Sequence, residues 1–395
     1  MKFLFSRPWL PLVGFVLALL LLAANMRGSL VVVGPLVESI GRDLSLSSVQ
    51  MGLLTTVPIL CFGLLSVMAP RIAGRHGLEL TLWGALALVA VGQGLRAVDH
   101  YTVMLLGTVI LGAAIALMNV LTPSLVRRSF PSRIALMTGV YTLTMSSVGA
   151  LAAFSAVPLR DAMKGNWQYP VGLWALFAAA AFLLWLPMLR FRHRADVPDR
   201  RSVSLWRNTE AWWLSVFFGC QSMVFYTCIA WLAKVFADAG MSEAKSGTLL
   251  TLYNLFGIPA TFLAPLIYTR MRNKALAMAL LHVPAVVGVA GFVLATTEWP
   301  YVWAICMGLG QGSMISVALT LIGIRGADAP TAASLSGMCQ SVGYLMAAVG
   351  PVLFGALHDG FGSWQVPLWL LMAVMIAQFG TALRAGAPRL ICPRD

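Results

Sequence analysis

A single arginine, Arg27, lies well inside the first long apolar segment, in the stretch LLAANMRGSLVVVGP at 21–35. Burying an arginine at the centre of a membrane span costs about 2.5–3.5 kcal/mol on insertion scales, so this position is typical of a functional group. A guanidinium suits planar groups with several oxygens, because its donors form a fixed fork. We therefore expect Arg27 to bind an anion or a strongly polar acceptor such as a nitro group. The alternative is an arginine held by backbone carbonyls or hydroxyls of a neighbouring helix.

The acidic residues offer no obvious partner for Arg27 at that depth. All 14 Asp and Glu fall in loops or at the ends of the spans predicted below, and Glu38 is about 16 Å away along a helix axis. Asn25 lies about 200° around the helix from Arg27 and need not share its face. The residues at helical spacing from Arg27 are small or of modest bulk, which leaves room beside the guanidinium: Ala23, Ala24, Val31 and Gly34.

Other polar side chains also lie inside apolar segments, where they could contact a small solute. Each taken singly is a weaker candidate, because such residues also join helices to one another. The predicted substrate-binding residues are Arg27, Asn25, Asn119, Tyr141, Thr142, Gln221, Tyr226, Gln311, Gln340 and Tyr344. His282 is a candidate for proton handling, with a packed neutral histidine as the favoured alternative. Gly149, Gly343 and Gly350 are expected at close helix contacts.

The composition defines the elements that must position these residues. Of 395 residues 59% are hydrophobic and 10% charged, whereas a soluble protein carries about 25% charged residues. Apolar runs of about 20 residues are long enough to cross a bilayer as helices. The sequence therefore predicts an all-α polytopic membrane protein with 12 transmembrane helices, near 10–37, 47–70, 78–97, 102–126, 133–158, 169–189, 211–236, 245–268, 275–296, 300–324, 332–356 and 365–384.

The distribution of positive charge orients the chain. Loops on one side of the predicted membrane hold 20 of the 27 Lys and Arg and loops on the other hold 6, with Arg27 inside a span. This positive-inside bias predicts cytoplasmic termini in a plasma (bacterial inner) membrane. The net charge of +13 thus serves orientation rather than nucleic-acid binding. The N-terminus imitates a secretory signal, but its apolar character continues past Ser29 to Val37, which favours an uncleaved span.

Cysteine usage predicts neither metal nor disulfide chemistry. Five of the six cysteines fall inside predicted spans, and no Cys-x-x-Cys occurs. Packed free thiols are the simpler interpretation. No metal and no cofactor are predicted.

The two halves of the sequence match at a nearly constant offset. GNWQYP at 165–170 recurs as GSWQVP at 362–367, and the frame of Gly112 and Arg127 recurs as Gly310 and Arg325, 198 residues later. The chain is therefore expected to form two six-helix bundles in a parallel pseudo-repeat, 1–190 and 211–395, joined by a cytoplasmic linker at 191–210. Such a repeat suits alternating access.

Two six-span halves joined by a charged loop resemble the major facilitator superfamily. The superfamily's signature loop between spans two and three is matched in part by APRIAGRHGLE at 69–79. Arg75 and Gly77 match this signature, and the resemblance therefore implies that they belong to a gating loop. Gly74 stands where Asp is usual and Leu78 where Arg is usual, which weakens a gating salt bridge there.

Longer phrases resemble one branch, the cyanate and 2-nitroimidazole transporter family. They are NMRGSLVVVGPLV at 25–37, SSVQMGLLTTVP at 47–58, NVLTPSLVRRSFP at 119–131 and LSGMCQSVGYLMAAVGP at 335–351. The resemblance implies transport of a small anion or a nitro- or azole-type solute. Gly28 departs from the family pattern, in which Pro often follows the arginine, so a kink there is permitted rather than imposed.

Two other functions compete with this interpretation. A multidrug or neutral-compound exporter of the same fold is an alternative, although a lipophilic cation would require an acid inside a span. A membrane-embedded enzyme is disfavoured, because no His-Glu-x-x-His, no Gly-x-Ser-x-Gly and no soluble catalytic domain occurs. Anion uptake opposes the membrane potential by about 2.3 kcal/mol per 100 mV, so a uniporter or exporter is favoured over a carboxylate-driven antiporter. We expect a monomer.

Overall fold

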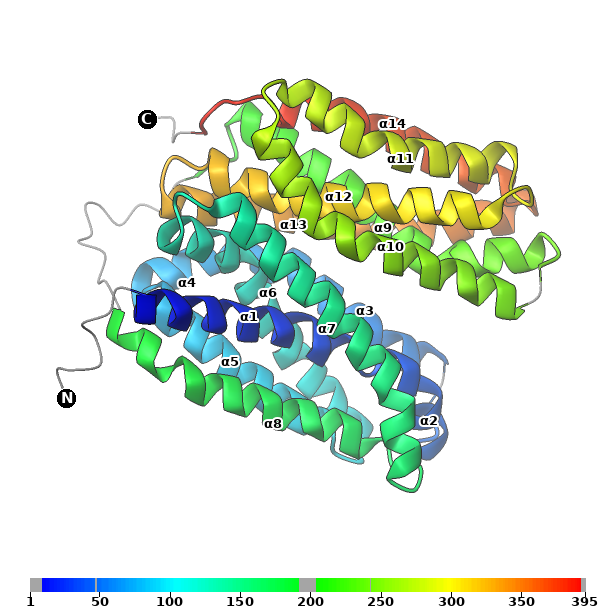
Figure 1. Cartoon of the computed structure of the whole chain (residues 1–395). Helices are drawn as coiled ribbons and strands as arrows, with labels where there is room; N and C mark the ends of the chain where they lie inside the picture. Colours follow the sequence, from blue (N-terminus) through cyan, green and yellow to red (C-terminus); the bar gives the residue numbers. More distant parts are fainter. Residues whose placement is uncertain (1–8, 47, 192–203, 242, 392–395) are drawn as a thin grey trace. The chain divides into compact units, whose positions relative to one another are not determined.

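The computed structural model describes residues 9–46, 48–191, 204–241 and 243–391 (Figure 1). Its named elements are all helical: α1 (Trp9–Val31), η1 (Gly34–Leu36), α2 (Val37–Asp43), α3 (Ser48–Leu65), η2 (Ser66–Met68), α4 (Ala69–His76), α5 (Leu78–Arg96), α6 (Tyr101–Ser129), α7 (Ile134–Ala162), α8 (Gln168–Trp185), η3 (Leu186–Phe191), α9 (Thr209–Asp238), α10 (Glu243–Arg270), α11 (Lys274–Leu294), α12 (Pro300–Arg325), α13 (Ala329–Phe361) and α14 (Gln365–Ala385).

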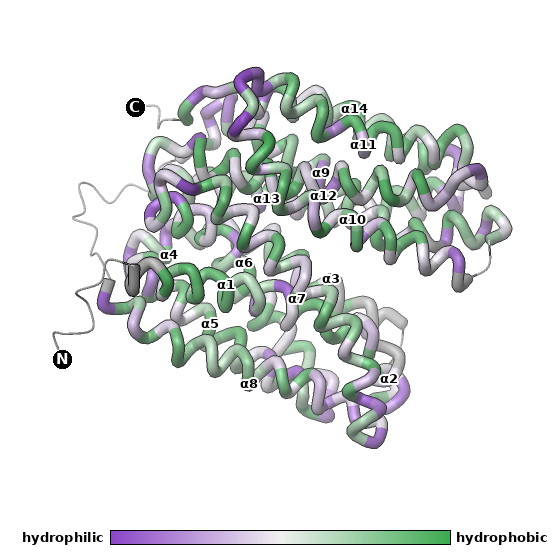
Figure 2. The backbone as a smooth tube through the Cα atoms, in the orientation of Figure 1, coloured by the Kyte–Doolittle hydropathy of each residue, from purple (hydrophilic) through white to green (hydrophobic). Residues whose placement is uncertain are grey.

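Within the described residues, twelve segments are long and apolar enough to cross a membrane. Hydrophobic residues run along the helices, and hydrophilic residues gather toward helix ends and connections (Figure 2). In a bilayer only helices and closed barrels satisfy every backbone polar group, so this pattern fixes the secondary structure. The predicted all-α, twelve-span architecture is confirmed.

The described chain divides into two compact units. The first comprises residues up to Leu125 and residues from Val140 to Phe191, and the second comprises Val126–Gly139 and the residues from 204 onward. The segment Val126–Gly139, which joins α6 to α7, thus groups with the second half of the chain. Most of the predicted linker 191–210 lies outside the described residues, and the domain boundaries 1–190 and 211–395 stay a prediction.

Two predicted spans of the first unit are interrupted helices. Helix α1 ends at Val31, and the chain continues through η1 into α2. The second span passes from α3 through η2 into α4, so helix extends beyond Pro70, where the sequence placed the end of the span. Pro70 lies in the first turn of α4, where no backbone N–H is required from it.

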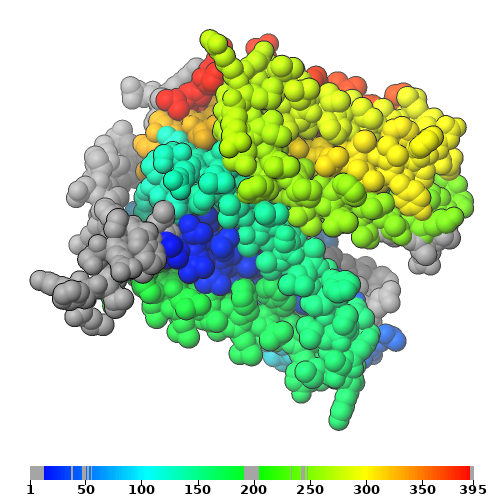
Figure 3. Space-filling view, in the orientation of Figure 1, coloured from blue at the N-terminus to red at the C-terminus, as the bar shows by residue number. Residues whose placement is uncertain are grey.

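Helix α1 lies between α7 and α8 in the first unit and reaches the surface there (Figure 3; α1 blue, α7 teal, α8 green). Helices α5 and α8 pack closely against each other. A buried apolar cluster joins the end of the first span to α6, α7 and α8 through Val32, Leu36, Met104, Ala156 and Val171. This cluster anchors the part of the first span that follows Arg27.

In the second unit, glycines bring α10 and α12 into backbone contact. A Cβ on Gly308 would lie 2.2 Å from the Tyr253 carbonyl oxygen, and one on Gly312 would lie 2.3 Å from the Gly257 oxygen. Membrane helices approach this closely where small residues are spaced four apart. A buried apolar core that includes Phe236, Val289 and Phe292 extends to Tyr253 and Met307 beside this contact.

A buried arginine joins the end of α12 to the start of α9 and to the segment after α14. Arg325 at the end of α12 donates hydrogen bonds to the carbonyl oxygens of Ala385 (2.6 Å) and Arg389 (2.8 Å) and to the Glu210 carboxylate (2.9 Å). The backbone N–H of Ile391 in turn donates to the Arg325 carbonyl at 2.7 Å. The segment after α14 is thereby fastened to the start of α9 and the end of α12.

An ion pair at the end of α9 gives a pH prediction. Trp364 donates its indole N–H to Asp238 at 2.9 Å, and the Lys234 ammonium lies 3.0 Å away, so the pKa of Asp238 is lowered. A lowered pKa means that stability is present above the unfolded value, about 3.9, and is lost as the pH falls through the folded value. At pH 7 the melting temperature of Asp238→Asn is expected to be lower than that of wild type. Near pH 3 the two melting temperatures should be the same. Thermal unfolding in detergent at both pH values measures this, and an equal gap at both would contradict it.

Candidate functional site

Arg27 lies midway along the first span, on a part of α1 whose neighbouring residues are fully buried. Its own side chain is half-buried. The aliphatic stem rests against Gly149 of α7, since a Cβ built on Gly149 would lie 2.6 Å from Cγ of Arg27. The sequence predicted Gly149 as a close-contact position, and the structure identifies Arg27 as what it contacts within the first unit.

Gly28 makes room for a tryptophan. A Cβ on Gly28 would lie 2.0 Å from Cη2 and 2.2 Å from Cζ3 of Trp174 in α8. Trp174 is held edge-to-face against Phe177, with ring centroids 5.3 Å apart. Helix α1 continues without interruption through Gly28, so the glycine serves the indole contact and the helix ends only at Val31.

A second buried arginine supports α1 close to Arg27. Arg96 of α5 is 1% exposed and donates to the Ser29 carbonyl oxygen (2.8 Å) and to Oε1 of Gln93 (3.2 Å). Because α1 ends at Val31, Ser29 lies in its last turn, where carbonyls lack intrahelical donors and the dipole favours a cation. Gln93 donates in turn to the Val171 carbonyl of α8 at 3.3 Å. The sequence analysis did not identify Arg96 as a residue of the site.

The remaining predicted residues of the first unit come from α1, α6 and α7. Asn25 is fully buried and donates its amide N–H back to the Leu21 carbonyl at 2.9 Å, while its Oδ1 has no hydrogen-bond partner among the described residues. Asn119 is half-buried in α6, and Tyr141 and Thr142 are buried in α7. These positions leave their roles as substrate contacts a prediction.

In the second unit, two predicted glutamines contact each other. Gln221 of α9 donates to Gln311 of α12 at 3.4 Å, and Gln311 donates to Gln378 of α14 at 3.3 Å. All three side chains are buried. Gln378 was missed by the sequence analysis, although an amide inside an apolar helix is the signal that identified the other two.

Two predicted tyrosines also come together. The rings of Tyr226 in α9 and Tyr344 in α13 lie 6.4 Å apart between centroids, and Tyr344 packs edge-to-face on Phe218 at 5.8 Å. Gln340, one turn before Tyr344, donates to Ser336 on its own helix at 2.8 Å. The structure therefore joins α9 and α13 through aromatic contacts at predicted positions.

The predicted proton-handling and gating residues lie elsewhere. His282 of α11 is fully buried and packs against Phe379, with ring centroids 5.2 Å apart. Arg75 is exposed in the last turn of α4, and Gly77 joins α4 to α5 with φ +87°, a left-handed conformation that favours glycine. The positive φ explains why position 77 is a glycine. The gating role of Arg75 and Gly77 stays a prediction.

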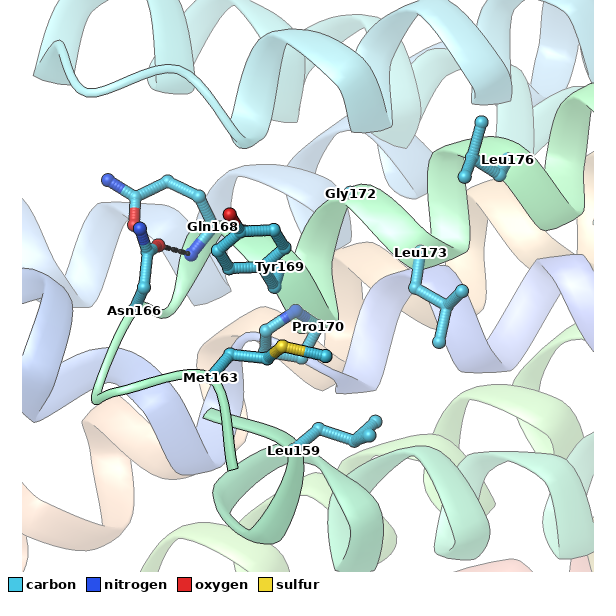
Figure 4. Close-up of a pocket in the computed structure, with 9 residues that line it drawn as sticks. All are labelled: Leu159, Met163, Asn166, Gln168, Tyr169, Pro170, Gly172, Leu173 and Leu176. Atoms are coloured by element: carbon cyan, nitrogen blue, oxygen red, sulfur yellow. Dashed lines mark hydrogen bonds between the residues drawn. The ribbon is translucent and has the colours of Figure 1, made fainter. Parts of the chain in front are cut away.

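A groove of about 580 Å³ opens at the turn between α7 and α8 (Figure 4). Its lining is largely apolar and includes Leu159, Met163, Pro170, Leu173 and Leu176. Asn166 accepts a hydrogen bond from the Gln168 backbone N–H at 2.9 Å on its rim. None of the predicted substrate-binding residues lines this groove, so it does not bear on the choice of solute.

Comparisons with known proteins agree with this architecture. Residues 13–348 match the family model described as Major Facilitator Superfamily. The chain is 37% identical to an uncharacterized transporter, YycB, of Bacillus subtilis (strain 168), over 94% of this chain and 93% of that protein. It is 36% identical to a 2-nitroimidazole transporter of Escherichia coli (strain K12), over 92% and 93% of the two chains. The cyanate transport protein CynX of the same organism is 28% identical, over 91% and 94%.

A solved structure shares the fold. The transporter FucP in an outward conformation matches with a TM-score of 0.77 over 95% of this chain and 99% of that chain, at 14% sequence identity. At that identity the likeness concerns the fold alone. The family match and the relatives show what the chain is: a multi-pass membrane transporter, not an enzyme, that belongs to the Major Facilitator Superfamily.

Proposed function

We propose that the chain moves a small anion or a small polar nitro- or azole-type solute across the plasma membrane by alternating access, with Arg27 as the main substrate anchor. The observation that carries this proposal is the half-buried state of Arg27 at mid-span. Arg96 and Arg325 are both fully buried and hold backbone carbonyls. Arg27 differs from them in keeping part of its side chain accessible.

The chemistry of the relatives supports the same class of solute. One is named as a 2-nitroimidazole transporter and another as a cyanate transport protein. Cyanate is a small anion, and a nitro group presents two oxygens in a plane. A guanidinium can donate two parallel hydrogen bonds to a planar pair of oxygens. The other predicted polar residues are secondary contacts in this proposal.

Orientation follows from the charge pattern. With 20 of 27 basic residues on one side, both termini are cytoplasmic. The protein works as a monomer within the lipid bilayer. With no acidic residue in the middle of a predicted span, facilitated or potential-driven movement is favoured over exchange driven by an embedded carboxylate.

Counterflow in proteoliposomes tests the anchor directly. We expect wild type to exchange at least one of cyanate, nitrate, a small carboxylate and 2-nitroimidazole, and Arg27→Met to lose that exchange. Methionine keeps a long unbranched stem and removes the charge, so the packing on Gly149 is preserved. Counterflow needs no driving ion, so the assay detects transport whatever the coupling.

The matched control is Arg389→Ala, which removes an exposed arginine that is not a predicted substrate contact. It should exchange as wild type does. Equal exchange by Arg27→Met and wild type would make Arg27 structural and reject the anchor. Exchange of neutral lipophilic compounds by wild type, with none of the four solutes accepted, would favour the neutral-compound exporter instead.

A further inference from the structure

We propose that Gly149 is a positioning residue for transport. By having no side chain, it sets the direction in which Arg27 extends from α1. This inference deepens the proposed function and rests on it, because it concerns the same anchor. Gly149 lies in α7 and is buried within the first unit.

The contact involves the base of the arginine side chain rather than its tip. A Cβ on Gly149 would lie 2.6 Å from Cγ, 3.6 Å from Cβ and 3.8 Å from Cδ of Arg27. The first of these distances is shorter than real carbon contacts allow. The stem of Arg27 therefore occupies the space that any other residue at 149 would need.

Sterics, rather than backbone conformation, explain the glycine. Gly149 lies in the interior of α7 and does not adopt a positive φ. Glycine is a poor helix former at such a position, where alanine would be favoured. The close contact with Arg27 explains why position 149 holds a glycine, because any other residue would add a Cβ that clashes with Cγ of Arg27.

Moving Cγ redirects the charged group. The position of Cγ is set by χ1, and long side chains in helices have only two common χ1 wells. If Arg27 relieves a clash at Cγ by changing its χ1 rotamer, the rest of its side chain points to another side of α1. The guanidinium, at the end of the chain, then moves farthest.

Helix α1 cannot easily retreat to relieve the clash. On its other side Trp174 fills the space above Gly28, where a Cβ would lie 2.0 Å from the indole. Arg96 also holds the last turn of α1 through the Ser29 carbonyl. The side chain of Arg27, rather than the helix, has to adjust to a substitution at Gly149.

The second unit contains a comparable contact without a charge. A Cβ on Gly350 of α13 would lie 2.6 Å from the Thr227 hydroxyl oxygen and 2.7 Å from Cγ of Met223, both in α9. There, as in the first unit, side chains from the first long helix of the unit lie against a glycine of the fifth. In the second unit, uncharged side chains therefore fill the comparable contact.

Two measurements test the inference. In counterflow with labelled 2-nitroimidazole and cyanate, Gly149→Ala is expected to raise the half-saturation concentration about tenfold, with a smaller fall in maximal rate. The control is Gly84→Ala, at a helical glycine of the same unit where no other described helix comes within 4 Å of a Cβ position. It should stay within about twofold of wild type, the range of surface substitutions.

Thermal unfolding in detergent provides the second measurement, which needs no substrate. Gly149→Ala should lower the melting temperature in the wild-type background and leave it unchanged or raised in the Arg27→Ala background, where the stem is gone. Such non-additivity is the signature of direct contact.

The outcomes separate the two proposals. If Gly149→Ala keeps both the half-saturation concentration and the melting temperature while Arg27→Met loses exchange, the positioning role is rejected and the anchor stands. If the melting temperatures show the coupling but Arg27→Met exchanges normally, the contact is only structural, and both proposals fail.

Discussion

Replacing Arg325 by alanine is expected to cost about 3 kcal/mol of stability, the lower end of what loss of one partner in a buried ion pair costs. The side chain is 3% exposed, and it bonds the Glu210 carboxylate and two backbone carbonyls at once. Alanine would leave the carbonyls of Ala385 and Arg389 without this donor. Lysine should rescue only part of the loss, because an ammonium cannot reproduce the planar fork.

The experiment compares melting temperatures in detergent for all variants. The rate of tryptic cleavage at Arg389 is compared between Arg325→Ala and wild type only, because Arg389→Ala lacks that cleavage site. Freed from Arg325, the segment around Arg389 and Ile391 should be cut faster. The matched control is Arg389→Ala, because Arg389 contacts the same Glu210 carboxylate but is 71% exposed. Its effect should stay within about 1 kcal/mol, as for surface pairs. Equal losses in the two alanine variants would contradict the assigned role of Arg325.

Gly308→Ala is expected to destabilise the second unit by about 1–3 kcal/mol, the usual cost of overpacking. The new Cβ would lie 2.2 Å from the carbonyl oxygen of Tyr253. That oxygen belongs to the backbone, so no side-chain rotation can relieve the clash. Helices α10 and α12 would have to separate, which also disturbs the contact between Gly312 and Gly257.

Melting temperature in detergent measures this effect, with Gly380→Ala as the control. Gly380 lies in α14 of the same unit, and no other described helix comes within 4 Å of a Cβ position there. Alanine at 380 should be neutral or stabilising by up to about 1 kcal/mol, because it is the better helix former. A loss as large as that of Gly308→Ala would show that glycine matters in these helices for a reason other than close contact.

The twelve spans and the family were predictable from the sequence because each depends on local properties. A span is recognised by about 20 consecutive apolar residues, and its secondary structure is then imposed by the lack of water in the bilayer. The interruptions were not predictable in the same way. The end of α1 at Val31 lies in an apolar stretch that hydropathy extends to Val37, and Arg96 from another helix supports that end.

In the candidate site too, local features were predictable from the sequence and contacts between helices were not. Arg27 stands out in the sequence because its charge is costly inside a span. Its contact Gly149 could be recognised only as a small residue, since nothing local tells which side chain a glycine accommodates. The same holds for Gln378, which becomes meaningful once Gln311 is found to donate to it.

The repeated arginines Arg127 and Arg325 show what the sequence determines and what only the tertiary structure decides. The sequence by itself placed both at the same point of the repeat, 198 residues apart, and at the ends of apolar segments. Only the tertiary structure decided their partners. Arg325 is buried against Glu210, whereas Arg127 donates to the Gly323 and Ala327 carbonyls at 2.7 Å each, at the end of α12. Hydropathy and spacing act along the chain and can be read from it, but a guanidinium's partners come from segments that only folding brings into hydrogen-bond distance.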